Sequence, residues 1–82
     1  MSVEAIQQAY QDLTDFIYDH PHMTGVELLR HARKEMQEQW LVLIDNEKAQ
    51  LGAAFSRANW KRELLFRLDP ERFAHGGKHA YF

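Results

Sequence analysis

The chain has 82 residues, with 10 Lys and Arg against 12 Asp and Glu, and it contains no cysteine. A chain of this length supports one domain with a thin core, because small domains bury a smaller fraction of their surface on folding. Without cysteine, disulfides and thiolate metal sites are excluded. A formal net charge of −2 gives no overall electrostatic reason to expect nucleic acid or a membrane as the partner.

The first residues lack the basic and apolar segments of a signal peptide. The longest unbroken apolar run covers residues 40–44, whereas a membrane-spanning helix needs about 20 apolar residues. We therefore expect a cytoplasmic protein with no membrane partner.

Apolar residues recur every three or four positions from Val3 to Ile17. This spacing is typical of a helix that buries one face. Ser2 is a suitable N-cap, and Pro21 disfavours helical geometry in the residue before it. The sequence predicts a helix over residues 3–18.

A second helix start is marked by a capping box. Thr24 and Glu27 have the required spacing, in which each side chain bonds the backbone N–H of the other residue. The helical period of apolar residues then continues and predicts one helix over residues 25–45. Residues 40–44 are apolar on every side, so an α+β domain with a short strand at residues 40–44 is the alternative.

A third helical period runs from Leu51 to Leu68 and ends before Pro70. The sequence thus predicts an all-α fold, a small three-helix domain over residues 1–70. We expect residues 71–82 to form a short, partly ordered C-terminal tail, because they contain a Gly pair and lie at the chain end.

Residue types that carry catalysis are sparse. The two serines, Ser2 and Ser56, lie in no nucleophile turn, and the four glycines form no phosphate-binding loop. Five histidines include two closely spaced pairs, and solvent-exposed loop histidines explain them better than a metal site. We predict no enzyme activity, no catalytic residue, no metal and no cofactor.

Charge is distributed unevenly along the chain. The first 29 residues hold five acidic and no basic residues, while residues 48–82 hold seven basic and three acidic residues. Such a layout can steer a charged partner or pair two copies head to tail.

Protein binding is the hypothesis that these features favour. The chain has ten aromatic residues, and aromatic and arginine side chains are enriched at interface hot spots. We expect a small adaptor, regulator or inhibitor that acts through protein–protein contacts, with a homodimer as a further option. The predicted partner-binding residues form an apolar centre, an aromatic tail and an acidic set that guides docking. They are Trp40, Leu43 and Ile44, then Phe73, Tyr81 and Phe82, and finally Asp12, Asp15 and Asp19.

A nucleic-acid-associated regulator is the alternative hypothesis. Basic clusters lie on the second and third predicted helices, where a tryptophan could stack on a base while the cations meet phosphates. Against it, the first predicted helix is acidic, and the turn after it lacks the glycine usual in a helix-turn-helix. The predicted nucleic-acid-binding residues are Arg30, Arg33, Lys34, Arg57, Trp60, Lys61 and Arg62.

Overall fold

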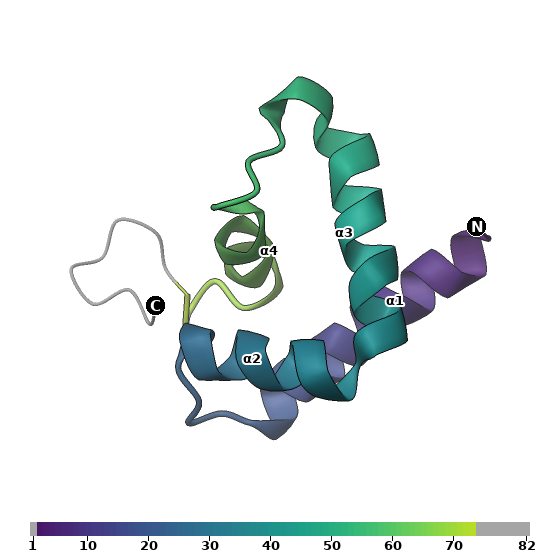
Figure 1. Cartoon of the computed structure of the whole chain (residues 1–82). Helices are drawn as coiled ribbons and strands as arrows, with labels where there is room; N and C mark the ends of the chain where they lie inside the picture. Colours follow the sequence, from purple (N-terminus) through teal and green to yellow (C-terminus); the bar gives the residue numbers. More distant parts are fainter. Residues whose placement is uncertain (1, 74–82) are drawn as a thin grey trace.

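The computed structural model describes residues 2–73 of the chain. Over these residues the chain is helical and contains no strand, and the successive helices turn sharply at their connections (Figure 1). The predicted all-α fold is confirmed, and the alternative strand at residues 40–44 is wrong, because these residues lie inside a helix. The elements are α1 (Val3–Asp19), α2 (Gly25–Glu35), α3 (Gln37–Leu51), the 3₁₀-helix η1 (Gly52–Ala54) and α4 (Trp60–Leu68).

Helix α1 follows the sequence prediction closely. The Ser2 hydroxyl accepts a hydrogen bond from the backbone N–H of Ala5 at 3.1 Å, which caps the first turn. Along the helix, Ala9, Leu13 and Ile17 are buried, as their spacing of four residues requires. The predicted helix start is confirmed, and the end differs by one residue.

The predicted helix over residues 25–45 is two helices, so the described residues hold four α-helices rather than three. Met36 interrupts the helix with φ −123° and ψ 50°. A straight helix from Gly25 to Leu51 would be about 40 Å long, longer than the 37 Å maximum extent of the fold. The bend at Met36 instead allows the buried faces of α2 and α3 to meet the same core (Figure 1).

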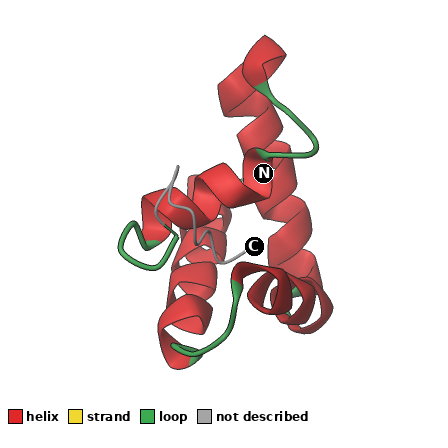
Figure 2. Cartoon of the chain, turned by 90° about the vertical axis from the view of Figure 1, so that its left-hand side faces the viewer, coloured by secondary structure: helices red, strands yellow, loops and turns green. Residues whose placement is uncertain are grey.

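The predicted third helix begins later than its apolar spacing indicates. Helix α3 ends at Leu51, and its C-cap, Gly52, has a φ of 54°, in the left-handed region that favours glycine. Residues 55–59 form a loop, and α4 starts at Trp60. Figure 2 shows that the described part of the chain consists of helices joined by loops. The predicted end of this helix at Leu68 is confirmed.

The core contains side chains from every α-helix and from the segment after α4. The Trp40 and Trp60 rings meet there, with centroids 5.5 Å apart, and Phe73 is also buried. Packing therefore continues past residue 70, while residues 74–82 of the predicted tail lie outside the described residues. The buried apolar residues are Ala9, Leu13, Ile17, Leu28, Ala32, Met36, Trp40, Leu43, Trp60, Leu64, Leu65 and Phe73.

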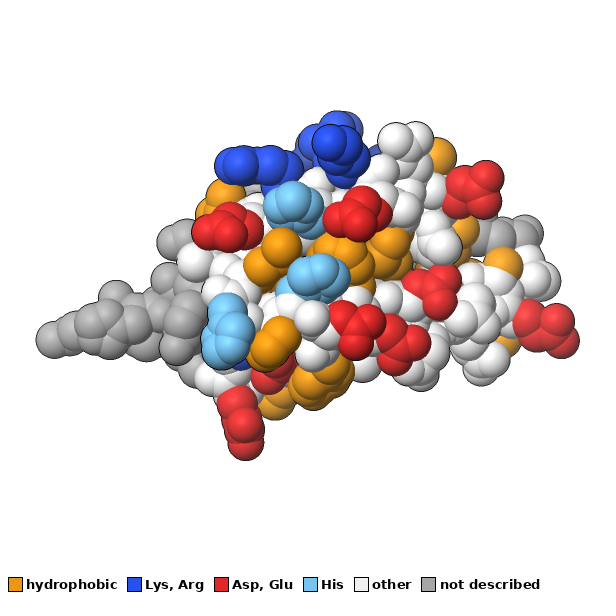
Figure 3. Space-filling view, turned by 90° about the horizontal axis from the view of Figure 1, so that it is seen from below, with side chains coloured by type: hydrophobic (Ala, Val, Ile, Leu, Met, Phe, Trp, Pro, Cys, Tyr) orange, Lys and Arg blue, Asp and Glu red, His pale blue; other side chains and the backbone are white. Residues whose placement is uncertain are grey.

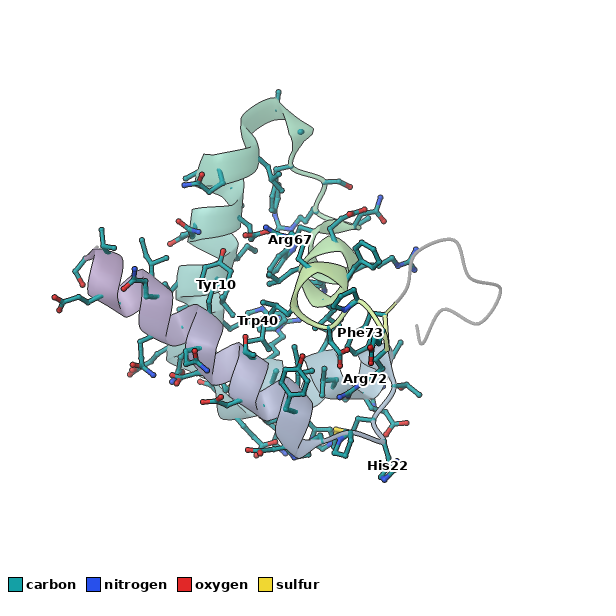
Figure 4. All side chains as sticks on the ribbon, turned by 180° about the vertical axis from the view of Figure 1, so that it is seen from behind. Tyr10, His22, Trp40, Arg67, Arg72 and Phe73 are labelled. Carbon is teal, nitrogen blue, oxygen red and sulfur yellow. The ribbon has the colours of Figure 1, made fainter. Side chains whose placement is uncertain are left out.

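Arg72 links the segment after α4 to the end of α1 through hydrogen bonds (Figure 4). Its guanidinium donates hydrogen bonds of 2.8 Å to the carbonyl oxygens of Ile17 and His20. The same group lies 3.2 Å from the Asp69 carboxylate. A cation at the carbonyl end of a helix is favourable, and α1 has no basic residue of its own in its last turn. This contact holds Phe73 over the core.

A buried polar network joins α1, α3 and α4. Glu47 is only 2% exposed, and its carboxylate accepts hydrogen bonds from the Tyr10 hydroxyl at 2.5 Å and from the Arg67 guanidinium. The Asn46 side-chain amide donates to the Tyr10 hydroxyl at 2.9 Å. The carboxylate is therefore satisfied, as a buried charge must be.

Burial and the hydrogen bond to Glu47 raise the pKa of Tyr10 to about 12. Between pH 10 and pH 12 the unfolded chain has lost this proton while the folded protein keeps it, so the stability falls as the pH rises through this window. The free energy of unfolding, measured with urea, should fall between pH 9 and pH 11.5 in the wild type. We expect a smaller fall over the same range in Tyr10→Phe, which has no phenolic proton to lose. Equal losses in both proteins would contradict the role of Tyr10.

Candidate functional site

Basic side chains from two helices meet at one groove. Its main part is a hollow of about 310 Å³ between α2, α3 and α4, and Arg33 and Trp40 also line an adjoining hollow of about 210 Å³. Because the two hollows share these residues, we treat them as one surface and call it the α2–α4 groove. Its lining residues are Val26, Leu29, Arg30, Arg33, Gln37, Trp40, Leu41 and Lys61.

Helix α2 sets one side of the groove. The Thr24 hydroxyl accepts a hydrogen bond from the Glu27 backbone N–H at 3.3 Å, as the first half of the predicted capping box requires. From this start, Leu28 and Ala32 point into the core. Positions 26, 29, 30 and 33 then share the neighbouring face, because they are spaced by three and four residues.

The groove is apolar at its floor and basic at its rim. Trp40 is 8% exposed and lies between the groove and the core. Leu41, at the other end of the groove, is 65% exposed, which is high for a leucine. In the view from below, Lys and Arg side chains gather along one edge of the molecule, while Asp and Glu are spread over the rest of that face (Figure 3).

The structure does not bring together the residues predicted to bind a partner. Leu43 and Phe73 are core residues, so in this fold their side chains are not available to a partner. Trp40 also belongs to the core and shows only an edge to the groove, and Ile44 is a half-buried residue packed against the core. The three positions on α3 are buried because α1 and α2 pack against this helix and the Trp60 ring of α4 meets Trp40. Tyr81 and Phe82 lie outside the described residues.

The predicted acidic set lies on α1 and does not line the groove. Asp12 accepts hydrogen bonds from the side-chain amides of Gln8 at 2.8 Å and Gln39 at 3.1 Å. Asp15 accepts one from Gln11 at 2.9 Å. The amide partners carry no charge, so these hydrogen bonds place no cation beside Asp12 or Asp15, and Asp15 and Asp19 lie on the exposed surface of α1.

Of the predicted nucleic-acid-binding residues, the fold brings Arg30, Arg33 and Lys61 to one groove. Trp60 is buried in the core, so in this fold its ring is not available to stack on a base. The other three cations, Lys34, Arg57 and Arg62, are exposed but do not line the groove.

A second hollow, of about 410 Å³, lies between the end of α3, the following loop and α4. Arg67 borders it, and the buried Glu47 carboxylate holds that guanidinium. Ser56 also borders it, with its carbonyl accepting the Trp60 backbone N–H at 2.9 Å to start α4. These polar groups are used by the fold, so this hollow offers less for a partner than the α2–α4 groove.

Sequence reasoning named Trp40 but missed the other apolar residues of the groove. Val26 and Leu29 lie one position from the buried residues of α2, a signal that could have revealed them. Gln37 and Leu41 join the groove only because the helix bends at Met36.

Within residues 2–73, no three or more His, Asp or Glu side chains cluster closely enough to hold a metal ion. In the same part of the chain, none of the helices combines the length and apolar character that crossing a membrane requires. Comparison with protein families, curated proteins and solved structures found no match to this chain.

Proposed function

We propose that this protein is a small adaptor, regulator or inhibitor that binds another protein through the α2–α4 groove. The observation that supports this proposal is the convergence of Arg30, Arg33 and Lys61 around exposed apolar residues. A central apolar patch with a charged rim is the usual composition of a protein-binding surface, and arginine is enriched in it. The rim favours an acidic partner, because complementary charge steers encounter and suppresses wrong partners.

Nucleic-acid binding is the second candidate, since the same three cations could neutralise phosphates. The burial of both tryptophans weighs against it, because single-stranded nucleic acid is bound largely by stacking on aromatic side chains. Nuclease treatment separates the two candidates, because it removes nucleic acid and leaves a direct protein–protein contact intact. We propose no catalytic role, cofactor or metal for the chain. We propose the cytoplasm as its location.

Affinity capture of the tagged full chain from its native lysate tests the proposal. We expect a protein partner that resists nuclease treatment and is reduced at least tenfold by Arg30→Glu, which reverses one charge at the groove rim, roughly the loss that reversing an important interface charge produces. Arg57→Glu is the matched control, because Arg57 is exposed in the loop before α4 and does not line the groove.

The outcomes separate the candidates. A partner that Arg30→Glu captures as well as the wild type does would show that the groove is not the contact surface. Recovery of nucleic acid, with the captured proteins lost after nuclease treatment, would favour the second candidate.

A further inference from the structure

A surface whose charge complements that of the α2–α4 groove lies on α1 of the same chain. Asp15, Tyr18 and Asp19 are spaced by three and four residues, so they share one exposed face of that helix. Tyr18 is 58% exposed although it is a large aromatic side chain. We call these three residues the α1 acidic face. No Lys or Arg occurs anywhere in α1.

We propose that the α2–α4 groove of one copy binds the α1 acidic face of a second copy. This inference rests on the proposed function, that the groove is a protein-contact surface, and names the partner. Tyr18 supplies an amphipathic ring of the kind that interfaces prefer, suited to the apolar floor beside Leu41. The two carboxylates of this face, Asp15 and Asp19, are opposite in charge to the three rim cations of the groove.

Both surfaces are already exposed in a single copy of the chain. The Tyr18 hydroxyl makes one long hydrogen bond, 3.3 Å to the carbonyl oxygen of Leu68, which holds the ring at the surface. Arg30 and Arg33 are exposed on α2. Both surfaces are therefore presented without a rearrangement of the fold.

The contact joins different surfaces, so it is head to tail. Each copy presents both a groove and an acidic face, and such a heterologous contact forms rings or extended chains of copies. Exposed ion pairs contribute little individually and are screened by salt. We therefore expect weak association that increases with protein concentration and declines with salt.

Sedimentation equilibrium of the full chain measures this association. We expect the average mass to rise from that of one copy between about 10 μM and about 1 mM, where small wet interfaces associate. The rise should disappear when the salt is increased from about 0.01 M to about 1 M, since the Debye length falls from about 30 Å to about 3 Å.

A charge exchange between the two surfaces tests the contact itself. Arg30→Glu with Arg33→Glu makes the groove acidic, and Asp15→Lys with Asp19→Lys makes the α1 face basic. Each double variant alone then presents two surfaces of like charge and should remain a single copy at low salt. An equimolar mixture pairs opposite charges at both contacts and should recover the association of the wild type. Circular dichroism of each variant checks that it remains folded.

A wild type that stays a single copy at low salt and about 1 mM would overturn the inference. So would a mixture of the double variants that fails to associate, or association that the charge reversals do not change. If self-association is absent but Arg30→Glu still loses a captured protein, the inference fails and the proposed function stands. If neither self-association nor groove-dependent capture occurs, both fail.

Discussion

Trp40→Ala is expected to lower the free energy of unfolding by about 3–5 kcal/mol, the usual loss when a buried tryptophan is truncated. The indole is 8% exposed and packs against Trp60 across the centre of the core. Small domains have an unfolding free energy of only about 5–15 kcal/mol, so this variant should be largely unfolded at moderate urea concentrations.

Urea denaturation followed by circular dichroism measures the effect, with Leu41→Ala as the control. Leu41 is the next residue on α3 and is 65% exposed, so its truncation should change the stability by less than about 1 kcal/mol. Near-wild-type stability for Trp40→Ala would mean that the indole is not part of the core. The same argument makes Trp40 unsuitable for testing partner binding, because its loss would unfold the groove together with the core.

Glu47→Ala is expected to destabilise the protein by about 2–3 kcal/mol. The substitution leaves the Tyr10 hydroxyl without its acceptor and removes the link between α3 and α4. Arg67 is 54% exposed at its side chain and can be hydrated after the change, so the loss should lie below the 3–5 kcal/mol typical of breaking a fully buried pair.

Glu47→Gln separates the charge from the hydrogen bonds. The amide oxygen can still accept from Tyr10, so we expect a smaller loss of about 1 kcal/mol. Urea titrations of both variants at neutral pH provide the comparison. Equal losses in the two variants would mean that the negative charge, rather than the hydrogen-bond acceptor, accounts for the stabilisation.

Several helix ends were predicted correctly from local signals. The limits of α1 follow from Ser2 and Pro21, and the end of α4 follows from Pro70. The bend at Met36 has no such signal, because no Gly or Pro is present and Met36 and Trp40 keep the helical spacing of four. Only the need to fit both helices around one core explains it.

Gly52 is a local signal for the end of a helix, but the sequence prediction passed over it. The apolar spacing from Leu51 to Leu68 continued past it by coincidence, and periodicity alone does not distinguish one helix from two that bury their faces against one core. Its left-handed conformation separates α3 from α4.

The candidate site was predicted only in part. The cluster at Arg30 and Arg33 is local to one helix, so the sequence reveals it directly. Lys61 lies near this cluster only because α4 packs beside α2, and the spacing of residues within one helix does not predict such a tertiary contact. Burial of the two tryptophans depends on the same packing, which is why aromatic residues that indicated a binding surface form the core instead.

Chemical-shift mapping tests the central claim, that the α2–α4 groove contacts another protein. Isotope-labelled full chain is titrated with the partner identified by capture, or with the unlabelled chain if the partner is a second copy. The account predicts the largest shifts at the backbone amides of Arg30, Arg33 and Lys61 and at the Trp40 indole N–H. Shifts confined to the hollow beside Ser56 and Arg67, with the groove unchanged, would contradict it.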